Sequence, residues 1–108
     1  MDVQLKRGML EACVLSVLER RDSYGYQLIK DIGACVEISE STLYPILKRL
    51  EAAGMLTVYS REYNGRLRKY YRITPVGKAR LSMFKDDWQK VVAVYDFINR
   101  QQEGAENE

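Results

Sequence analysis

The chain has 108 residues, enough for one domain with a modest core, and its 46% hydrophobic and 30% charged residues are typical of a soluble globular protein. Its formal net charge is only +2, which argues against a protein that coats nucleic acid regardless of sequence. The sequence contains no histidine, and this removes the usual general base, the commonest metal ligand and the ordinary pH switch.

The two cysteines, Cys13 and Cys35, do not have the spacing of a metal site. We expect structural thiols in a reducing compartment, with a redox sensor as the less favoured alternative. An apolar run over residues 9–18 resembles the core of a signal peptide, but Glu11 interrupts it and no small-residue cleavage site follows. The run is also too short to cross a bilayer, so we expect a cytoplasmic protein without a membrane partner.

The first element is predicted to be a helix over residues 3–20. Its apolar residues form two neighbouring stripes that together cover more than half of the circumference: Leu5, Met9, Ala12, Cys13 and Val17 in one, and Leu10, Val14 and Leu18 in the other. A helix that is apolar over so much of its surface is buried on more than one side. In a chain of this length, the second side is a candidate subunit interface.

A second helix is expected from about Tyr24 to Gly33, with Ser23 able to cap its start and Gly33 suited to its end. Tyr24 and Tyr26 fall at the N-terminus of this helix, where free backbone N–H groups can meet a phosphate. The alternative for Tyr26 is that its ring packs into the core, whereas we expect Tyr24 to be exposed or to make such a contact.

The third helix lies between Ser39 and Gly54. Either Ser39 or Ser41 can cap its start, and Gly54 stands where a helix ends in the left-handed conformation. Pro45 is tolerated only near the N-terminus of a helix, so the helix is expected to begin at about residues 40–42. Leu43, Ile46, Leu47 and Leu50 form one apolar stripe; Ser41, Pro45 and Lys48 point the opposite way, with Thr42, Tyr44 and Arg49 on the flanks.

A β-hairpin is predicted next. Residues 55–62 and 68–73 are rich in Val, Ile, Thr and Tyr, and Asn64-Gly65 between them is the strongest short-range signal for a hairpin turn. Five basic side chains against the one carboxylate of Glu62 leave this hairpin with a local charge of +4. A helix with a polar outer face followed by a basic hairpin is the arrangement of a winged helix-turn-helix, in which one element enters the major groove and the hairpin follows the DNA backbone.

Thr74-Pro75 is typical of an N-cap followed by the first residue of a helix. Beyond it, apolar residues recur at spacings that alternate between three and four, which is the a/d pattern of a helix seam: Leu81, Phe84, Trp88, Val91, Tyr95 and Ile98. Such a long helix must overhang a small domain, and its seam needs a partner, most simply a second copy. The expected fold is mainly α with a small β-hairpin: a winged helix-turn-helix over residues 1–74, a dimerisation helix over 75–100 and a disordered tail over 101–108.

Three blocks of the sequence resemble the PadR family of transcriptional regulators. They are G-Y-Q-L-I-K at 25–30, T-L-Y-P-I-L-K-R-L-E-A-A-G-M-L at 42–56 and R-K-Y-Y-R-I-T-P-V-G at 68–77, and the resemblance runs in order from about Leu5 to Ile98. It implies a winged helix-turn-helix in a homodimer and, because these proteins are mostly repressors, a role in repression. Many members have His before the Gly-Tyr pair, where this chain has Tyr24; we expect this difference to alter a DNA contact and to leave the fold unchanged.

We expect the polar face of the third helix to enter the major groove of double-stranded DNA and the hairpin to contact mostly phosphates. The candidate DNA-binding residues are Tyr24, Tyr26, Ser41, Thr42, Tyr44, Lys48, Arg61, Asn64, Gly65, Arg66, Arg68 and Lys69. Because side chains alternate along a strand, not all of the hairpin cations can face DNA at once, and the tip residues Asn64, Gly65 and Arg66 are the best supported. The alternative is that the basic hairpin is a solvated edge that resists aggregation.

The candidate dimer-interface residues are Leu10, Val14, Leu81, Phe84, Trp88, Val91, Tyr95 and Ile98. The resemblance implies a further site, because some short PadR-like regulators hold flat aromatic compounds at the dimer centre beside a tryptophan such as Trp88. The candidate pocket residues are Val14, Leu15, Phe84, Trp88 and Val92. We favour the plainer interpretation, in which Trp88 only packs the interface.

The leading hypothesis is a homodimeric repressor that binds an inverted-repeat operator, with release by a small planar aromatic effector as a finer expectation. The alternative is a winged-helix module that binds another protein and has no specific affinity for DNA. An enzyme is not expected, because the sequence has no phosphate loop, metal cluster or nucleophile elbow, and neither a cofactor nor a metal is expected.

Overall fold

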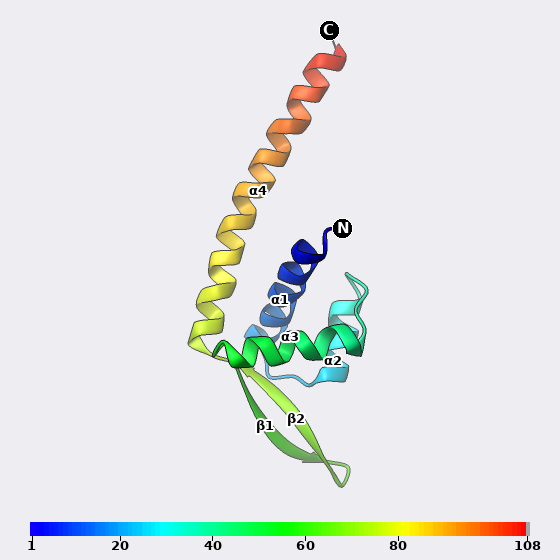
Figure 1. Cartoon of the computed structure of the whole chain (residues 1–108), viewed down its shortest axis with the longest axis vertical. Helices are drawn as coiled ribbons and strands as arrows, with labels where there is room; N and C mark the ends of the chain where they lie inside the picture. The colour runs from blue at the N-terminus through cyan, green and yellow to red at the C-terminus, as the bar shows by residue number, and fades with distance from the viewer. Residues whose placement is uncertain (108) are drawn as a thin grey trace.

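Three helices and a β-hairpin form a small body, from which a long C-terminal helix rises as an arm (Figure 1). This computed structural model describes residues 1–107, with side chains described as far as Gln101. The elements in chain order are α1 (Val3–Arg20), α2 (Gly25–Gly33), α3 (Glu40–Ala52), β1 (Leu56–Tyr63), β2 (Arg66–Ile73) and α4 (Pro75–Asn107). The predicted fold class, mainly helical with a two-stranded antiparallel hairpin, is confirmed. No helix in the described part is long and apolar enough to cross a membrane.

The core lies where α1, α2 and α3 pack on one another and on the base of the hairpin. Its largest fully buried side chains are Leu10, Val14, Leu18, Leu28, Leu43, Leu47 and Leu56. The apolar stripe that the sequence predicts on α3 is buried in full. Burying a leucine or valine side chain contributes about 1.5–3 kcal/mol, so this cluster holds the three helices in fixed relative positions.

The start of α2 differs from the prediction. Ser23 does not cap the helix; its backbone N–H donates to the carbonyl of Tyr71 (3.2 Å), and its carbonyl accepts from the N–H of Tyr71 (2.8 Å). Ser23 therefore extends the edge of the hairpin, and α2 begins at Gly25 with Tyr24 as an N-cap residue that makes no side-chain hydrogen bond to the helix. The first N–H groups of α2 consequently have no side-chain partner.

The left-handed positions lie where the sequence predicts them. Gly54 follows α3 with a φ of 76°, and the N–H groups of Gly54 and Met55 close the helix end on two carbonyls of its last turn. At the hairpin tip, Asn64 and Gly65 have φ values of 51° and 79°, which is the backbone of a tight two-residue turn. Gly33, by contrast, is the last residue of right-handed α2 and does not end it in a left-handed conformation.

Thr74 joins the start of α4 to the end of α3. Its Oγ1 accepts from the N–H of Gly77 (3.1 Å), as expected of an N-cap residue, and donates to the carbonyl of Gly54 (2.6 Å). Its backbone N–H donates to the carbonyl of Met55 (3.0 Å). A Cβ at Gly77 would lie 2.5 Å from that same carbonyl oxygen, so the close approach of the two elements requires glycine at this position.

The arm, α4, continues farther than predicted. It ends at Asn107, where we expected a helix that stops at residue 100 and a disordered tail after it. Gly104 does not stop the helix, because one interior glycine costs only about 1 kcal/mol and no proline follows. The last residue of the expected tail, Glu108, lies outside the described residues. The molecule has extents of 68 × 26 × 22 Å, so α4 overhangs the body as predicted.

Candidate nucleic-acid interface

The outer face of α3 is polar and open. Ser41, Pro45 and Lys48 are all exposed on it, as the helical spacing predicts. The hydroxyls of Ser41 and Thr42 both lie within hydrogen-bond distance of Ser39 Oγ, at 2.9 and 3.2 Å. Among the ion pairs of the described residues, none uses Lys48. This face therefore presents hydroxyls and a cation that can bond base edges or phosphates.

Pairing of β1 with β2 separates the basic side chains of the hairpin onto two faces. Directly paired residues project to the same side, and successive residues alternate. One face, which we call the arginine face, carries Tyr59, Arg61, Tyr63, Arg66, Arg68, Tyr70 and Arg72. Lys69 and Glu62 project from the opposite face. The alternation thus brings three of the expected DNA-binding cations together and separates Lys69 from them.

Arg68 is held between two tyrosine rings. Its guanidinium carbon lies 3.9 Å from the ring centroid of Tyr24 and 3.9 Å from that of Tyr63. A planar guanidinium stacks well on aromatic faces, whereas a lysine ammonium does not match this geometry. Arg68 therefore joins the hairpin to the N-terminus of α2, while Arg61 and Arg66 on the same face are exposed.

Asp22, in the turn between α1 and α2, anchors the base of the arginine face. Its Oδ2 accepts hydrogen bonds from the Tyr59 hydroxyl (2.6 Å) and from Arg72 Nε (3.1 Å). The hydrogen bond to Asp22 raises the pKa of Tyr59 and keeps its hydroxyl protonated as the donor. Asp22 is not among the residues that the sequence predicts at the interface. Tyr or Arg at every second position of the hairpin was the sequence signal for this contact.

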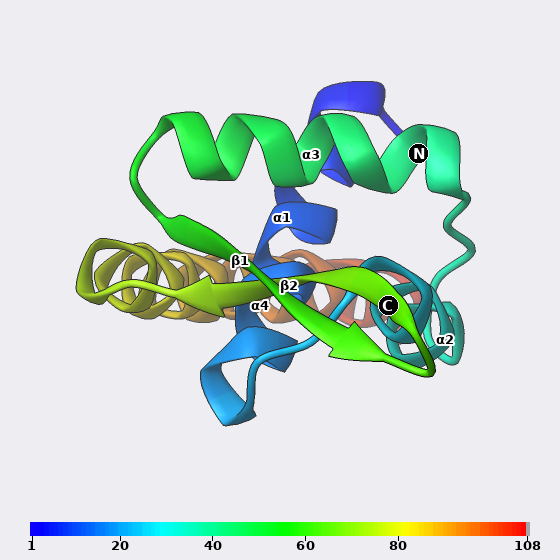
Figure 2. The same ribbon diagram turned by 90° about the horizontal axis from the view of Figure 1, so that it is seen from below.

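A hollow of about 420 Å³ lies between α2, α3 and β2, and it gathers five of the expected DNA-binding residues: Tyr24, Tyr26, Tyr44, Arg68 and Lys69. Figure 2 shows these three elements from below. Tyr26 is 63% exposed, so the alternative that its ring packs into the core is wrong. The Tyr44 hydroxyl lies over Gly25, where an added Cβ would overlap it. Two cations, several phenols and the N-terminus of α2 together suit a phosphate.

The residues expected at a dimer interface fall into two groups. Three of them are fully buried in the core of the single chain: Leu10, Val14 and Leu81. These three have no surface left for a partner, because the chain's own core accounts for their apolar character. The other five lie along α4 and are half-buried or exposed: Phe84, Trp88, Val91, Tyr95 and Ile98.

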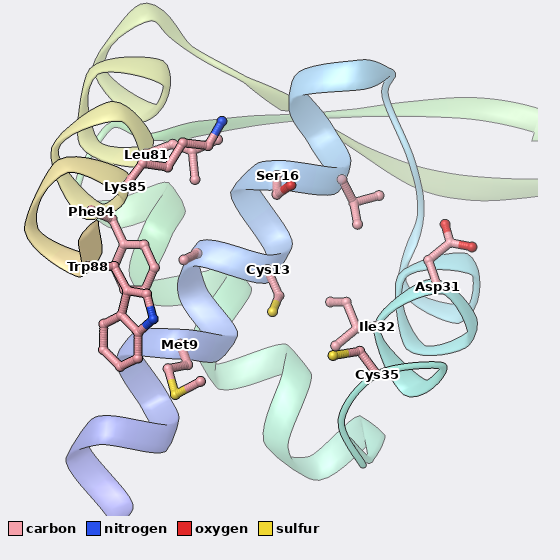
Figure 3. A pocket seen from close by; sticks show the side chains of 12 residues that line it. Met9, Cys13, Ser16, Asp31, Ile32, Cys35, Leu81, Phe84, Lys85 and Trp88 are labelled. Atoms are coloured by element: carbon pink, nitrogen blue, oxygen red, sulfur yellow. The ribbon is translucent and has the colours of Figure 1, made fainter. Parts of the chain in front are cut away.

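An apolar hollow of about 360 Å³ lies between α1, the end of α2 and α4 (Figure 3). Phe84 and Trp88 form part of its α4 wall, with ring centroids 5.8 Å apart and planes within 7° of parallel. The other expected pocket residues are not part of it. Val14 and Leu15 are buried in the core, and Val92 lines a separate shallow hollow along α4.

The two cysteines line the same hollow as free thiols (Figure 3). Cys13 is half-buried, whereas Cys35 is exposed. Burial, and to a smaller extent the neighbouring Cys35, raises the pKa of Cys13, so this thiol stays protonated at neutral pH. A protonated thiol is a poor nucleophile, and this agrees with the structural role expected for Cys13.

The chain is similar to known proteins along most of its length. A family model described as the Transcriptional regulator PadR-like family matches residues 14–83. The crystal structure of smu.1704 from Streptococcus mutans UA159 is 40% identical, with a TM-score of 0.79 over 85% of this chain and 87% of that one. A PadR family transcriptional regulator from Eggerthella lenta is 34% identical, with a TM-score of 0.79 over 89% and 86% of the two chains. An uncharacterized protein from Lysinibacillus sphaericus is 35% identical over an alignment of 97 residues, and the match covers 85% of this chain and 89% of the relative.

Proposed function

Because the chain belongs to the PadR-like family of transcriptional regulators, whose function implies DNA binding, we propose that it is a homodimeric repressor of an inverted-repeat operator. The observation that carries the proposal is the meeting of three elements around one hollow. These are α3 through Tyr44 on the flank of its polar face, the N-terminus of α2 and the basic hairpin. The family is one of regulators and not of enzymes.

In the proposed complex, α3 enters the major groove. Ser41 and Thr42 bond base edges or phosphates there, and Lys48 reaches guanine acceptors or phosphates. The hairpin follows the backbone with its exposed tip, where Arg66 contacts phosphate. Arg68, stacked between two rings, chiefly holds the hairpin against α2. Contacts of the hairpin position the protein, and contacts of α3 read the sequence.

The proposed dimer forms through α4. Large apolar side chains on its distal part are about half exposed, and a contiguous apolar surface of this kind marks an interaction site: Val91, Val92, Val94, Tyr95, Phe97 and Ile98. A second copy related by a two-fold axis would cover them with its own α4 and α1. A second hollow, lined by Phe84, Trp88 and Val92, joins the apolar hollow beside Trp88 to this surface along α4, and side chains of the other copy could occupy both.

A planar aromatic effector is the finer part of the proposal. Phe84 and Trp88 are already stacked, so a flat ligand in the adjoining hollow could continue the stack. The plainer alternative is that the second copy fills the hollow. Measuring the binding of planar aromatic ligands to a Trp88→Ala protein that still dimerises distinguishes an effector pocket from a hollow filled by the second copy. Loss of binding for every ligand would support the pocket, and unchanged binding would eliminate it.

Selection of bound duplexes from a random library at near-physiological salt tests DNA recognition. Enrichment of an inverted repeat, with half-sites roughly one helical turn apart, supports a symmetric dimer that reads sequence. Binding that shows no enrichment and vanishes as salt rises would contradict the proposal. That outcome would favour the alternative, a winged-helix module that binds another protein.

Repression itself is tested with a reporter gene placed behind the selected operator. Expression should rise when the chain is deleted and fall again when it is supplied. Lys48→Ala should weaken this repression, because it removes a cation from the exposed face of α3. A fall in expression on deletion would identify an activator instead.

A further inference from the structure

Two cations of α1 lie beside α3. Lys6 and Arg7 precede Leu10 by four and three residues, so they share the face of α1 that carries this buried side chain. Together with Ser41 and Thr42 they line a hollow of about 530 Å³ between the first turns of α1 and α3. Both cations are exposed. This basic edge is thus part of the surface around α3, although neither residue belongs to α2, α3 or the hairpin.

The helix macrodipole does not account for two cations at this position. It opposes positive charge near a helix N-terminus, so Lys6 and Arg7 gain no stabilisation from it. The carboxylate of the N-cap residue, Asp2, accepts from the N–H of Leu5 (3.0 Å). Among the residues that the structure describes, no ion pair includes Lys6 or Arg7; the pairs are Arg49–Glu11, Arg72–Asp22 and Lys85–Glu19. Both charges are therefore available to an external anion.

The position of this edge relative to the hairpin is informative. The hairpin and α4 leave the body in opposite directions, and the N-terminus of the chain lies on the α4 side of α3 (Figure 1). In the proposed dimer α4 leads to the second copy. The first turns of α1 then face the space between the two recognition helices, and the hairpins lie outside it.

We propose that Lys6 and Arg7 bind DNA phosphates on the inner side of each half-site, toward the centre of the operator. A helix in the major groove has a phosphate chain along each wall of the groove, and the hairpin can serve only one of them. The charged ends of Lys6 and Arg7 and the hydroxyls of Ser41 and Thr42 match the acceptor oxygens of phosphate. The inference rests on the proposed DNA-binding dimer and adds a second backbone contact to it.

A double variant, Lys6→Gln with Arg7→Gln, tests the inference on the operator obtained by selection. The matched control is Arg20→Gln with Arg21→Gln, which removes the same charge at the far end of α1 from exposed positions. Glutamine is a good helix former, so both proteins should fold. Two contacts per protomer make four per dimer. The slope of log K against log[salt] should therefore become shallower by up to about 3.6 in the test variant and stay unchanged in the control.

Each outcome decides something. Equal changes in both variants would show an effect of net charge alone and overturn the inference. An unchanged slope in the test variant, with normal binding by the wild-type protein, would also overturn it and leave the proposed function intact. Failure of the wild-type protein to bind any operator would instead reject the proposed function.

Ethylation of phosphates between the half-sites should weaken binding by the wild-type protein but not by the test variant. Interference confined to the outer phosphates would contradict the inference.

Discussion

Gly77→Ala should destabilise the protein, although alanine favours a helix over glycine by about 1 kcal/mol. The added Cβ would lie 2.5 Å from the carbonyl oxygen of Met55 and 2.8 Å from Cγ1 of Ile73. A backbone carbonyl at a helix junction cannot move aside freely, so α4 must shift, and overpacking of this kind costs about 1–3 kcal/mol. The shift also weakens the Thr74 cap, whose loss costs about 0.5–2 kcal/mol. The midpoints of these ranges sum to a net destabilisation of about 2 kcal/mol.

Thermal unfolding followed by circular dichroism measures this balance. For a domain of this size, the loss corresponds to a fall in Tm of about 5–20 °C. Gly8→Ala is the matched control, because an added Cβ there meets nothing within 4 Å; it should raise Tm by up to about 5 °C. Both proteins must be compared at one concentration, since the Tm of a dimer depends on it. A Gly77→Ala protein as stable as the wild type would refute the reasoning that the α3–α4 junction confines this position.

Three further predictions concern the interface and the apolar hollow. Arg68→Lys should weaken operator binding about 3–10-fold although the charge is kept, because lysine cannot stack between the two rings. Arg66→Lys at the exposed tip should change operator binding less than about twofold. Equal effects of the two substitutions in titrations with operator DNA would argue against the stacking role of Arg68. Gly25→Ala should displace the ring of Tyr44, which packs on this glycine, and lower the affinity for DNA measured by fluorescence anisotropy. Gly33→Ala in the same helix should leave the affinity unchanged, because an added Cβ there meets nothing within 4 Å. Iodoacetamide at pH 8 should alkylate Cys35 faster than Cys13, because burial raises the pKa of the Cys13 thiol. Equal rates of alkylation measured by mass spectrometry would contradict this prediction.

Features that depend on a few neighbouring residues could be predicted from the sequence. The first helix has the predicted bounds, Val3–Arg20; Gly54 adopts the expected left-handed conformation, and Asn64-Gly65 form the expected hairpin turn. Such residues are determined by local backbone preference, which is visible in a short stretch of sequence. The end of α4 could not be predicted in the same way, because a glycine without a following proline is only a weak stop signal.

Contacts between distant elements were beyond sequence reasoning. Asp22 meets Tyr59 and Arg72, which are 37 and 50 residues away. Strand alternation shows which hairpin side chains share a face, but not that this face turns toward Tyr24, since that depends on how α2 packs on the hairpin edge. Helical spacing likewise places Leu10 on an apolar stripe, but it does not show whether the chain's own core or a second chain covers this stripe.

The junction at Thr74 connects the arm to the recognition helix in the proposed dimer. Its two hydrogen bonds to the carbonyls of Gly54 and Met55, with Gly77 packed beside them, leave α4 little freedom to bend where it meets the end of α3. Trp88 is 13 residues from the start of α4, about 20 Å at 1.5 Å per residue. A rotation of about 10° near Trp88 therefore displaces α3 by about 3.5 Å over that lever. In the proposed dimer, half-site spacing must match the separation of the two recognition helices, so we expect whatever fills the hollow beside Trp88 to change the affinity for an operator of fixed spacing.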